Sequence, residues 1–352
     1  SRNDVDIDEF AKAWNASSKK LIVVGSHFPD TELQAVLNNF VNDASVLLLT
    51  ETSSNLHSKK CINAIDQLIF SLDDAQLKEF QVVSKKIKQV LRKHQPKHHW
   101  HVDVLKAMDT YHCLTEFVQQ KPTDFLLQLQ SESKEAHSNY QQRWLLEKEK
   151  RVQKHGRYLQ GVSHSDLKVF EQILERIPND SQVQLANSSV VRYAQLFDVH
   201  QSLRVFCNRG TSGIDGSTST AIGAALASEK QTVFITGDLS FFYDSNALWN
   251  AYIPKHFRII IINNFGGGIF RFIPGPKSTN ALEYFETPHQ LTAAQLADMY
   301  HFEYGSVSDG AELQTALATF YSVSEQPKIL EVFTDKEINE KVLKEYFNFL
   351  KE

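Results

Sequence analysis

Polar residues that follow two apolar segments near the middle of the chain have the types and spacing of a metal site. Residues 237–240 (GDLS) directly follow the apolar segment 232–236, and residues 263–266 (NNFG) directly follow 259–262. A carboxylate, an amide oxygen and a backbone carbonyl after a turn are hard oxygen ligands, which suit a Mg²⁺ ion that also contacts phosphates. Either string alone is explained as a turn, because Gly-Asp and Asn-Asn are common turn residues. Together, after two predicted strands, they favour a binding site.

The interval between Asp238 and Asn264 suits one helix followed by one strand, so both strings should lie at one edge of a parallel sheet. Ser240 is expected to precede a helix whose free N–H groups could take a diphosphate. The sequence therefore predicts a joint site for a metal ion and a diphosphate at this edge.

The second half of the chain repeats apolar segments separated by amphipathic ones. Helical periodicity is clearest in residues 291–299 and 311–321, and the stripe of Val342, Tyr346 and Phe349 is expected to pack in a core. Uniformly apolar strands that alternate with helices indicate a doubly wound, mostly parallel sheet of the α/β class, covered on both faces. The predicted strands are residues 183–186, 205–208, 232–236, 259–263, 301–305 and 329–333.

The first half alternates short aliphatic runs with amphipathic stretches. Asp30 is placed to cap a helix whose apolar residues recur on one face. The charged segment 131–155 is expected to be a solvated helix that leads to a linker punctuated by Gly156 and Gly161. We therefore place the domain boundary near residues 156–164. The other predicted elements are strands at 21–24, 46–49 and 98–102, and helices at 62–70 and 82–91.

The composition is that of a globular chain of about two domains. Of its 352 residues, 42% are hydrophobic and 22% charged, and 37 Lys and Arg stand against 42 Asp and Glu, for a net charge of −5. This balance does not indicate nucleic-acid binding. The longest aliphatic run, residues 259–262, is far shorter than the roughly 18 residues of a membrane span. Three widely spaced cysteines, Cys61, Cys113 and Cys207, form no metal-ligand pattern and favour a reducing cytoplasm.

With their flanking strings, these motifs resemble the thiamine-diphosphate enzymes. GDLS, followed by Tyr243 and NAL, and then IIIINNFGGGIF, look like that family's metal–diphosphate motif. The strings NSSVVR (187–192) and NRGTSGIDG (208–216) narrow the resemblance to a decarboxylating carboligase of menaquinone biosynthesis. The resemblance is strongest over residues 184–272 and extends loosely to 83–86 and 99–103. It implies a thiamine-diphosphate-binding domain at 156–352, preceded by a Rossmann-like (transhydrogenase-like) central domain at 1–155.

The resemblance also implies a role for each residue that matches a motif. The metal ion, Mg²⁺ or Mn²⁺, would be held by the side chains of Asp238 and Asn264 and the carbonyl of Gly266. Thiamine diphosphate would contact Gly237, Ser240, Ile214, Ile269 and Phe270, with Ile214 propping the cofactor in its bent shape. The substrate carboxylates would contact Ser188, Arg192 and Arg209, with the basic pair Lys85 and Lys86 facing the same cavity.

The implied reaction joins 2-oxoglutarate to isochorismate with loss of CO₂. Both substrates are dicarboxylates, and arginine matches carboxylate geometry with paired donors. Arg192 and Arg209 therefore favour this reaction over that of a pyruvate enzyme. An acetolactate synthase, a 2-oxoacid decarboxylase and a non-catalytic module that kept the fold are the alternatives. By analogy with family sites between two chains, a homodimer or homotetramer is expected, with no nucleic-acid or membrane partner.

The family also needs a glutamate on a separate pyrimidine-binding domain, which no segment of this chain resembles. We therefore name no catalytic residue, and we expect the chain to be part of a longer protein and to be inactive alone.

Two other patterns carry less weight. His98, His99, His101 and Asp103 suggest a transition-metal site, but strand alternation puts only the last three on one face, and a site needs convergent ligands. Residues 266–268 (GGG) lack both the Lys-Ser/Thr of a P-loop and the spacing of a dinucleotide fingerprint. These glycines are expected to let a loop move over the ligand.

Overall fold

The computed structural model describes residues 5–70, 72–73, 76, 91–272, 275 and 279–352. The chain divides into two compact units. The first unit comprises residues 1–155 with 350–352, and the second comprises residues 156–349.

The first unit is built on short parallel strands. Strands β1 (Lys20–Val24), β2 (Val46–Thr50) and β3 (Cys61–Ile62) form one sheet in that order, with Lys20 opposite Val46. Strands β4 (Trp100–Val102) and β5 (Glu116–Val118) form a second parallel pair. Every residue of β2 is buried, as expected for a central parallel strand. The strands predicted at 21–24, 46–49 and 98–102 are confirmed within two residues.

Helices surround these strands. Helix α2 (Thr31–Phe40) begins where predicted, because Asp30 Oδ1 accepts hydrogen bonds from the amides of Glu32 and Leu33 at 3.0 and 2.9 Å. The residues predicted at 62–70 form β3 and a five-residue helix instead of one long helix, and residues 82–90 lie outside the described part. The other helices of this unit are α1 (Ile7–Asn15), η1 (Thr52–Ser54), α3 (Ile65–Ile69), α6 (Pro122–Glu132) and α7 (Tyr140–Gly161).

The charged segment contains a helix, as predicted, and the two units divide at residue 156, but the glycine linker expected there is wrong and one face of the helix is not solvated. Helix α7 continues through Gly156 to Gly161, and its Trp144 is only 1% exposed. A glycine lowers helix stability by about 1 kcal/mol relative to alanine, and the surrounding Lys, Gln, Glu and Leu residues are strong helix formers. Tyr140 and Trp144 join a core cluster with Leu47, Leu49 and Ile62. One face of this charged helix is therefore buried.

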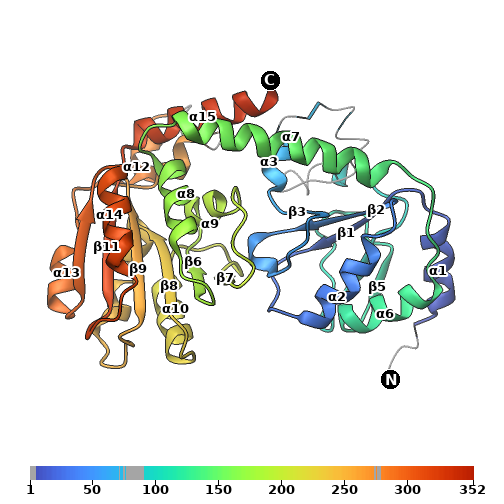
Figure 1. Cartoon of the computed structure of the whole chain (residues 1–352), viewed down its shortest axis with the longest axis horizontal. Helices are drawn as coiled ribbons and strands as arrows, with labels where there is room; N and C mark the ends of the chain where they lie inside the picture. The colour runs from blue at the N-terminus through green and yellow to red at the C-terminus, as the bar shows by residue number, and fades with distance from the viewer. Residues whose placement is uncertain (1–4, 71, 74–75, 77–90, 273–274, 276–278) are drawn as a thin grey trace. The chain divides into compact units, whose positions relative to one another are not determined.

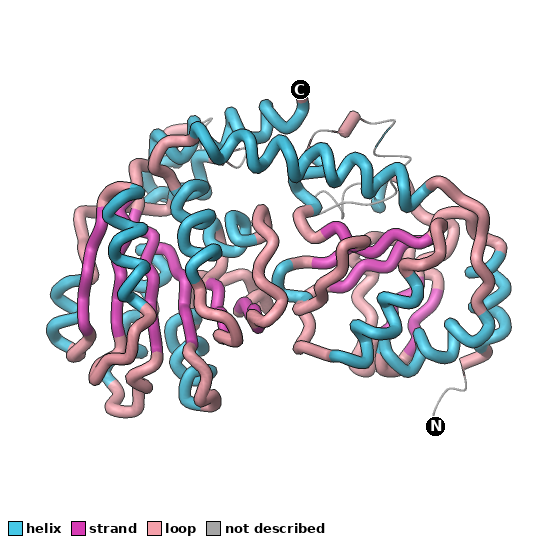
Figure 2. Tube along the Cα trace, viewed as in Figure 1, coloured by secondary structure: helices cyan, strands magenta, loops and turns pink. Residues whose placement is uncertain are grey.

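The second unit is a six-stranded parallel sheet in the order β10-β11-β9-β8-β6-β7. Its strands are drawn in magenta in Figure 2. Its sheet confirms the doubly wound α/β class predicted from the sequence. All seven residues of β9 are buried, so both faces of this strand are covered. The strands are β6 (Gln182–Leu185), β7 (Arg204–Cys207), β8 (Thr232–Gly237), β9 (Phe257–Asn263), β10 (Glu303–Val307) and β11 (Lys328–Phe333).

Helices cover this sheet. Helices α8 (Asp166–Arg176) and α14 (Gly310–Phe320) pack side by side (Figure 1). In α15 (Lys336–Lys351), Val342 and Tyr346 are buried, as the apolar stripe predicted. The remaining helices are α9 (Ser189–Ala194), α10 (Ser217–Leu226), α11 (Asp238–Tyr243), η2 (Ser245–Trp249), η3 (Gly268–Arg271), α12 (Leu282–Glu286) and α13 (Ala294–Met299).

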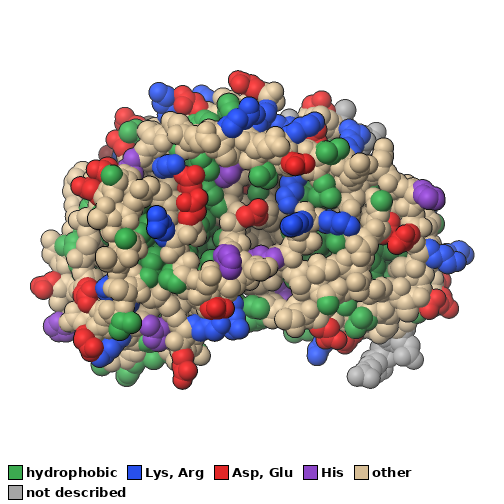
Figure 3. Space-filling model, in the orientation of Figure 1, with side chains coloured by type: hydrophobic (Ala, Val, Ile, Leu, Met, Phe, Trp, Pro, Cys, Tyr) green, Lys and Arg blue, Asp and Glu red, His purple; other side chains and the backbone are tan. Residues whose placement is uncertain are grey.

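Basic and acidic side chains are interspersed over the face shown in Figure 3, in keeping with the small net charge. Among the residues that the structure describes, no helix is both long and apolar enough to cross a membrane.

Candidate metal and cofactor site

The strand order of the second unit creates a switch point. The chain passes from β6 to β7 on one side and then returns to place β8 on the other side of β6. Ligands of open parallel sheets bind outside the carboxyl ends of the strands at such a point. Asp238 directly follows β8, Asn264 directly follows β9, and Ser188 and Arg209 follow β6 and β7. The structure thus brings these sequence-predicted residues to one edge of the sheet.

Asp238 connects the two motifs of this edge. It is the first residue of α11 and only 3% exposed. Its Oδ2 accepts a hydrogen bond from the amide of Gly266 at 2.9 Å, and its Oδ1 accepts one from the amide of Leu239 at 2.7 Å. The carboxylate that follows β8 is therefore in contact with the loop that follows β9.

The side chain of Asn264 is buried at the end of β9. The side chain is 7% exposed, and its Nδ2 donates to Asp166 Oδ2 at 3.3 Å. Its Oδ1 is buried and has no hydrogen-bond partner in the described part of the chain. Leaving a buried acceptor unpaired costs about 1–3 kcal/mol. An unpartnered oxygen at the sheet edge that also carries the Asp238 carboxylate and the Gly266 carbonyl has the chemistry to suit a hard cation such as Mg²⁺ or Mn²⁺.

The backbone after Asn264 is held in conformations that side chains disfavour. Phe265 has a φ of 61°, and its ring stacks on that of Phe333 with centroids 5.5 Å apart. Gly266 has a φ of 151°, and a Cβ on it would lie 2.7 Å from the carbonyl oxygen of Glu286. Only glycine fits at 266. Such strain is typical of functional sites.

An ion pair anchors the segment that follows. Arg271, the last residue of η3, pairs with the buried Glu286, which Lys336 also contacts at 3.3 Å. Burial raises the pKa of Glu286, but Arg271 and Lys336 outweigh that effect and hold the pKa below its usual range. The same η3 carries Ile269 and Phe270, both half-buried. The segment that carries Ile269 and Phe270, which the sequence analysis expected to contact the cofactor, is thus tied to α12 through Arg271.

Ser240 and Ile214, predicted to contact the cofactor, lie together. The Ser240 hydroxyl donates to the Ile214 carbonyl oxygen at 2.6 Å. The expectation that Ser240 precedes a helix is wrong, because α11 already begins at Asp238 and includes Ser240. Gly237 is the last residue of β8.

Two of the substrate residues predicted from the sequence, Ser188 and Arg209, lie in the loops that follow β6 and β7. Ser188 has a φ of 68° and follows Asn187, whose Nδ2 donates to the carbonyls of Asn208 and Gly213. Asn187 thereby fixes the loop that contains Arg209. Arg192 lies in α9, and both arginines are exposed. Lys85 and Lys86 lie outside the described residues.

Two functional candidates escaped the sequence analysis. Asp166, the first residue of α8, is 2% exposed and accepts hydrogen bonds from Thr334, Asn339 and Asn264. Burial is the main cause that raises its pKa to about 6, with a further contribution from Asp238, while the three hydrogen bonds oppose the rise. His289 Nε2 lies 3.2 Å from Asp238 Oδ2 and makes no hydrogen bond to any residue that the structure describes. Only the fold reveals either residue, because each lies far from its partner in the sequence.

The histidine pattern of the first unit lies on and beside β4. His99 lies in contact with Cys113, with Nδ1 and Sγ 3.6 Å apart, and burial lowers its pKa. In the part of the chain that is described, no three His, Cys, Asp or Glu residues converge as metal ligands.

A known protein family matches most of the second unit. Residues 187–332 match the family described as "Thiamine pyrophosphate enzyme, C-terminal TPP binding domain"; thiamine pyrophosphate is another name for thiamine diphosphate. This match spans the edge that carries Asp238, Asn264 and Gly266.

Curated relatives cover nearly the whole chain. The chain is 48% identical to the 2-succinyl-5-enolpyruvyl-6-hydroxy-3-cyclohexene-1-carboxylate synthase of Flavobacterium johnsoniae, over 97% of this chain and 64% of the relative. It is 46% identical to the same-named protein of Flavobacterium psychrophilum, over 98% and 64%, and 35% identical to that of Porphyromonas gingivalis, over 97% and 63%. The chain thus spans slightly less than two thirds of their length. Residues 187–332 of the chain therefore belong to the thiamine pyrophosphate enzymes, and nearly the whole chain is similar to part of the 2-succinyl-5-enolpyruvyl-6-hydroxy-3-cyclohexene-1-carboxylate synthases.

Proposed function

We propose that this chain takes part in the synthesis of 2-succinyl-5-enolpyruvyl-6-hydroxy-3-cyclohexene-1-carboxylate, by joining 2-oxoglutarate to isochorismate with loss of CO₂, in menaquinone biosynthesis. The observation that carries the proposal is the buried, unpaired Asn264 Oδ1 at the sheet edge that holds Asp238 and Gly266. The names of the relatives support this product.

In this proposal, Asp238, Asn264 and the Gly266 carbonyl hold Mg²⁺ or Mn²⁺. Thiamine diphosphate, when bound, supplies the nucleophilic carbon and the electron sink that decarboxylation needs. Ser240 and Ile214, joined by their hydrogen bond, together with Gly237, position the cofactor, and Ile269 and Phe270 exclude water from it.

The substrate carboxylates are recognised by cations at the neighbouring loops. Arg192 and Arg209 are exposed and can each offer two parallel donors to a carboxylate. Ser188 adds a hydroxyl donor. Lys85 and Lys86 add further positive charge. We assign the first unit to the central domain of the enzyme and the second to its diphosphate domain, working as a homodimer or homotetramer in the cytoplasm. The three free cysteines are in keeping with a reducing compartment.

A calorimetric titration of the full-length protein with thiamine diphosphate tests the proposal. Binding should require Mg²⁺ or Mn²⁺, and Asp238→Ala should abolish it. Asp298→Ala, which removes an exposed carboxylate from α13 of the same unit, is the matched control and should bind as the unchanged protein does. Metal-independent binding, or unchanged binding by Asp238→Ala, refutes the metal site.

The products separate the proposed reaction from that of a pyruvate enzyme. The loaded protein should release CO₂ from 2-oxoglutarate and form the named product only when isochorismate is present. Acetolactate formed from pyruvate would assign the chain to the other reaction class.

A further inference from the structure

A buried carboxylate, Asp166, joins three segments of the second unit that are far apart in the sequence. Its Oδ1 accepts hydrogen bonds from Thr334 Oγ1 at 2.7 Å and Asn339 Nδ2 at 2.9 Å. Its Oδ2 accepts one from Asn264 Nδ2 at 3.3 Å. Its own amide donates to Asn339 Oδ1 at 2.7 Å. Asp166 therefore links the start of α8 to the ends of β9 and β11 and to α15.

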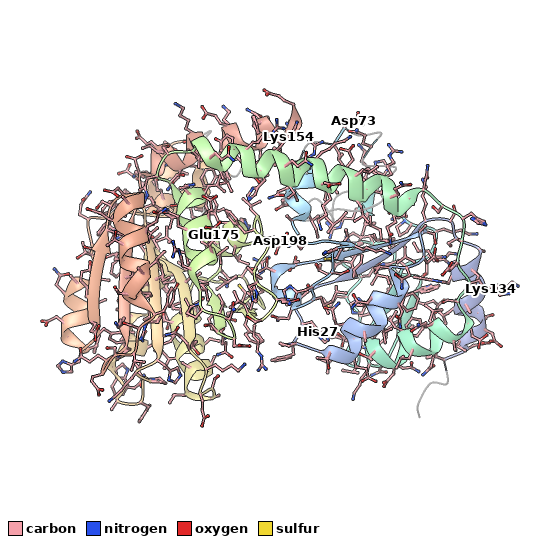
Figure 4. All side chains as sticks on the ribbon, in the orientation of Figure 1. His27, Asp73, Lys134, Lys154, Glu175 and Asp198 are labelled. Atoms are coloured by element: carbon pink, nitrogen blue, oxygen red, sulfur yellow. The ribbon has the colours of Figure 1, made fainter. Side chains whose placement is uncertain are left out.

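An acidic residue in the first turn of a helix commonly serves the helix alone, through the helix dipole. The carboxylate oxygens of Asp166 have other hydrogen-bond partners. All three donors to its carboxylate are neutral side chains of other segments, not amides of α8. By contrast, Glu175 near the other end of α8, labelled in Figure 4, is exposed. The buried acid of this helix thus serves a network outside it.

The chemistry of this network fixes the orientation of the Asn264 amide. An asparagine side chain has one end that donates and one that accepts, and a carboxylate only accepts. With Asp166 on one side, the NH₂ group must face the carboxylate, and the oxygen becomes the end that stays free. Only the oxygen can bind a cation, because a flipped amide would present its N–H groups to the positive charge.

We propose that Asp166 is a positioning residue, which orients the side chain of Asn264 so that its amide oxygen is available to the metal ion. This proposal rests on the proposed function, because it presupposes that Asn264 is a metal ligand. Thr334 and Asn339 hold the other oxygen of the same carboxylate and so fix Asp166 itself.

Removing the acceptor character of residue 166 should weaken metal binding. In Asp166→Asn, the new amide can donate or accept, so the Asn264 amide is no longer held in one orientation. Loss of a residue that orients a metal ligand typically weakens affinity roughly 10–100-fold. We expect a loss of that size in the Mn²⁺ affinity of the full-length protein with saturating thiamine diphosphate, with free Mn²⁺ measured by electron paramagnetic resonance.

Two control variants test whether a loss of Mn²⁺ affinity comes from the orientation of the Asn264 amide, from lower stability of the protein or from the loss of a negative charge. Thr334→Val removes a hydrogen bond from the same carboxylate but leaves its contact with Asn264 intact, so it should lower the melting temperature and change the Mn²⁺ affinity less than about twofold. Glu175→Gln removes an exposed negative charge from the same helix and should change neither quantity.

Exchanging the two side chains gives a second test. It compares Asn264→Asp with the double variant Asp166→Asn/Asn264→Asp and does not use the single variant Asp166→Asn. Asn264→Asp alone places two buried carboxylates side by side and should bind Mn²⁺ weakly. Adding Asp166→Asn restores a donor–acceptor pair with its direction reversed, so the double variant should bind Mn²⁺ at least tenfold more tightly than Asn264→Asp. Equal affinity of these two variants overturns the proposal.

The outcomes distinguish this proposal from the proposed function. If Asp238→Ala binds Mn²⁺ as the unchanged protein does, the metal site itself fails. If Asp238→Ala loses Mn²⁺ while Asp166→Asn retains full affinity, the metal site stands and the positioning role is overturned. The role is also overturned if affinity merely follows melting temperature across Asp166→Asn and Thr334→Val.

Discussion

Asn263 Nδ2 donates to Glu331 Oε1 at 2.7 Å, and both side chains are completely buried between neighbouring strands of the second unit. Glu331 Oε2 accepts two further hydrogen bonds, from the amide of Ala293 at 2.9 Å and the hydroxyl of Tyr304 at 2.6 Å. The residue before the proposed metal ligand Asn264 is therefore locked to β11, and through it to α13 and β10.

Glu331→Gln should destabilise the second unit by about 2–4 kcal/mol, because the new NH₂ group meets donors where the carboxylate offered acceptors. Urea unfolding followed by circular dichroism measures this change. Glu325→Gln, at an exposed glutamate paired with Lys255, serves as the control and should leave the midpoint unchanged. An unaltered midpoint for Glu331→Gln would show that the buried network contributes nothing.

Gly266→Ala should disrupt the site loop. The added Cβ would lie 2.7 Å from the carbonyl oxygen of Glu286, at a φ of 151° that alanine disfavours. We expect loss of metal-dependent binding of thiamine diphosphate and a lower stability, by about 1–3 kcal/mol. Both can be measured by thermal unfolding with and without cofactor and Mg²⁺.

The matched control for this change is Gly223→Ala. Gly223 lies in α10, and a Cβ there would meet no atom within 4 Å. Alanine is the better helix former, so this variant should be more stable by up to about 1 kcal/mol and should bind cofactor normally. Normal cofactor binding by Gly266→Ala would contradict the structural account of the loop.

Arg192→Gln and Arg209→Gln should each raise the KM for the dicarboxylate substrates by about tenfold or more, since a hydrogen bond to a charged group is lost. The affinity for thiamine diphosphate should stay the same. Arg204→Gln, at the exposed first residue of β7, should alter neither. Steady-state kinetics on both substrates, beside a cofactor titration, checks this. If KM is unchanged in both variants, the carboxylates are bound elsewhere.

The sequence predicted the second unit well because its strands are uniformly apolar and buried on both faces, as β9 illustrates. A short segment that is apolar throughout is typical of a parallel strand with both faces covered. The proposed site residues next to strand ends, such as Asp238 and Asn264, could be located for the same reason, because parallel strands bring their carboxyl ends to one edge.

What could not be predicted depends on tertiary contacts. In the sequence, Asp166 looks like an ordinary residue at the start of a helix. No sequence pattern indicates its contact with Asn264, which lies 98 positions away. Helix α7 was misjudged because its charges conceal Tyr140 and Trp144, which are buried only once β2 and β3 are in place. The prediction that Gly156 and Gly161 mark a linker also failed, since a helix that packs on one face tolerates glycine.

The last prediction concerns the first unit, where Lys20 Nζ pairs with Asp43 Oδ2 at 2.8 Å and both side chains are buried. Burial raises the pKa of Asp43, but the hydrogen bonds from Lys20 and Ser45 outweigh it and lower the pKa below its usual range. The folded state thus releases this proton more readily than the unfolded one. The stabilisation by Asp43 is therefore complete above the unfolded pKa of about 3.9 and is lost as the pH falls through the folded value.

Asp43→Asn should accordingly destabilise the first unit at neutral pH by about 3 kcal/mol, because it leaves the Lys20 ammonium buried without its counter-charge. It should also flatten the acid limb of the curve of unfolding free energy against pH. Tryptophan fluorescence reports mainly this unit, since three of the four tryptophans, Trp14, Trp100 and Trp144, belong to it and the fourth, Trp249, is exposed in the second unit. Lys20 Nζ lies 5.3 Å from the centre of the Trp14 ring. The double variant Lys20→Met/Asp43→Asn removes the stranded charge and should recover part of the loss. If the acid limb of Asp43→Asn has the same slope as that of the unchanged protein, the ion pair is not the source of its acid sensitivity.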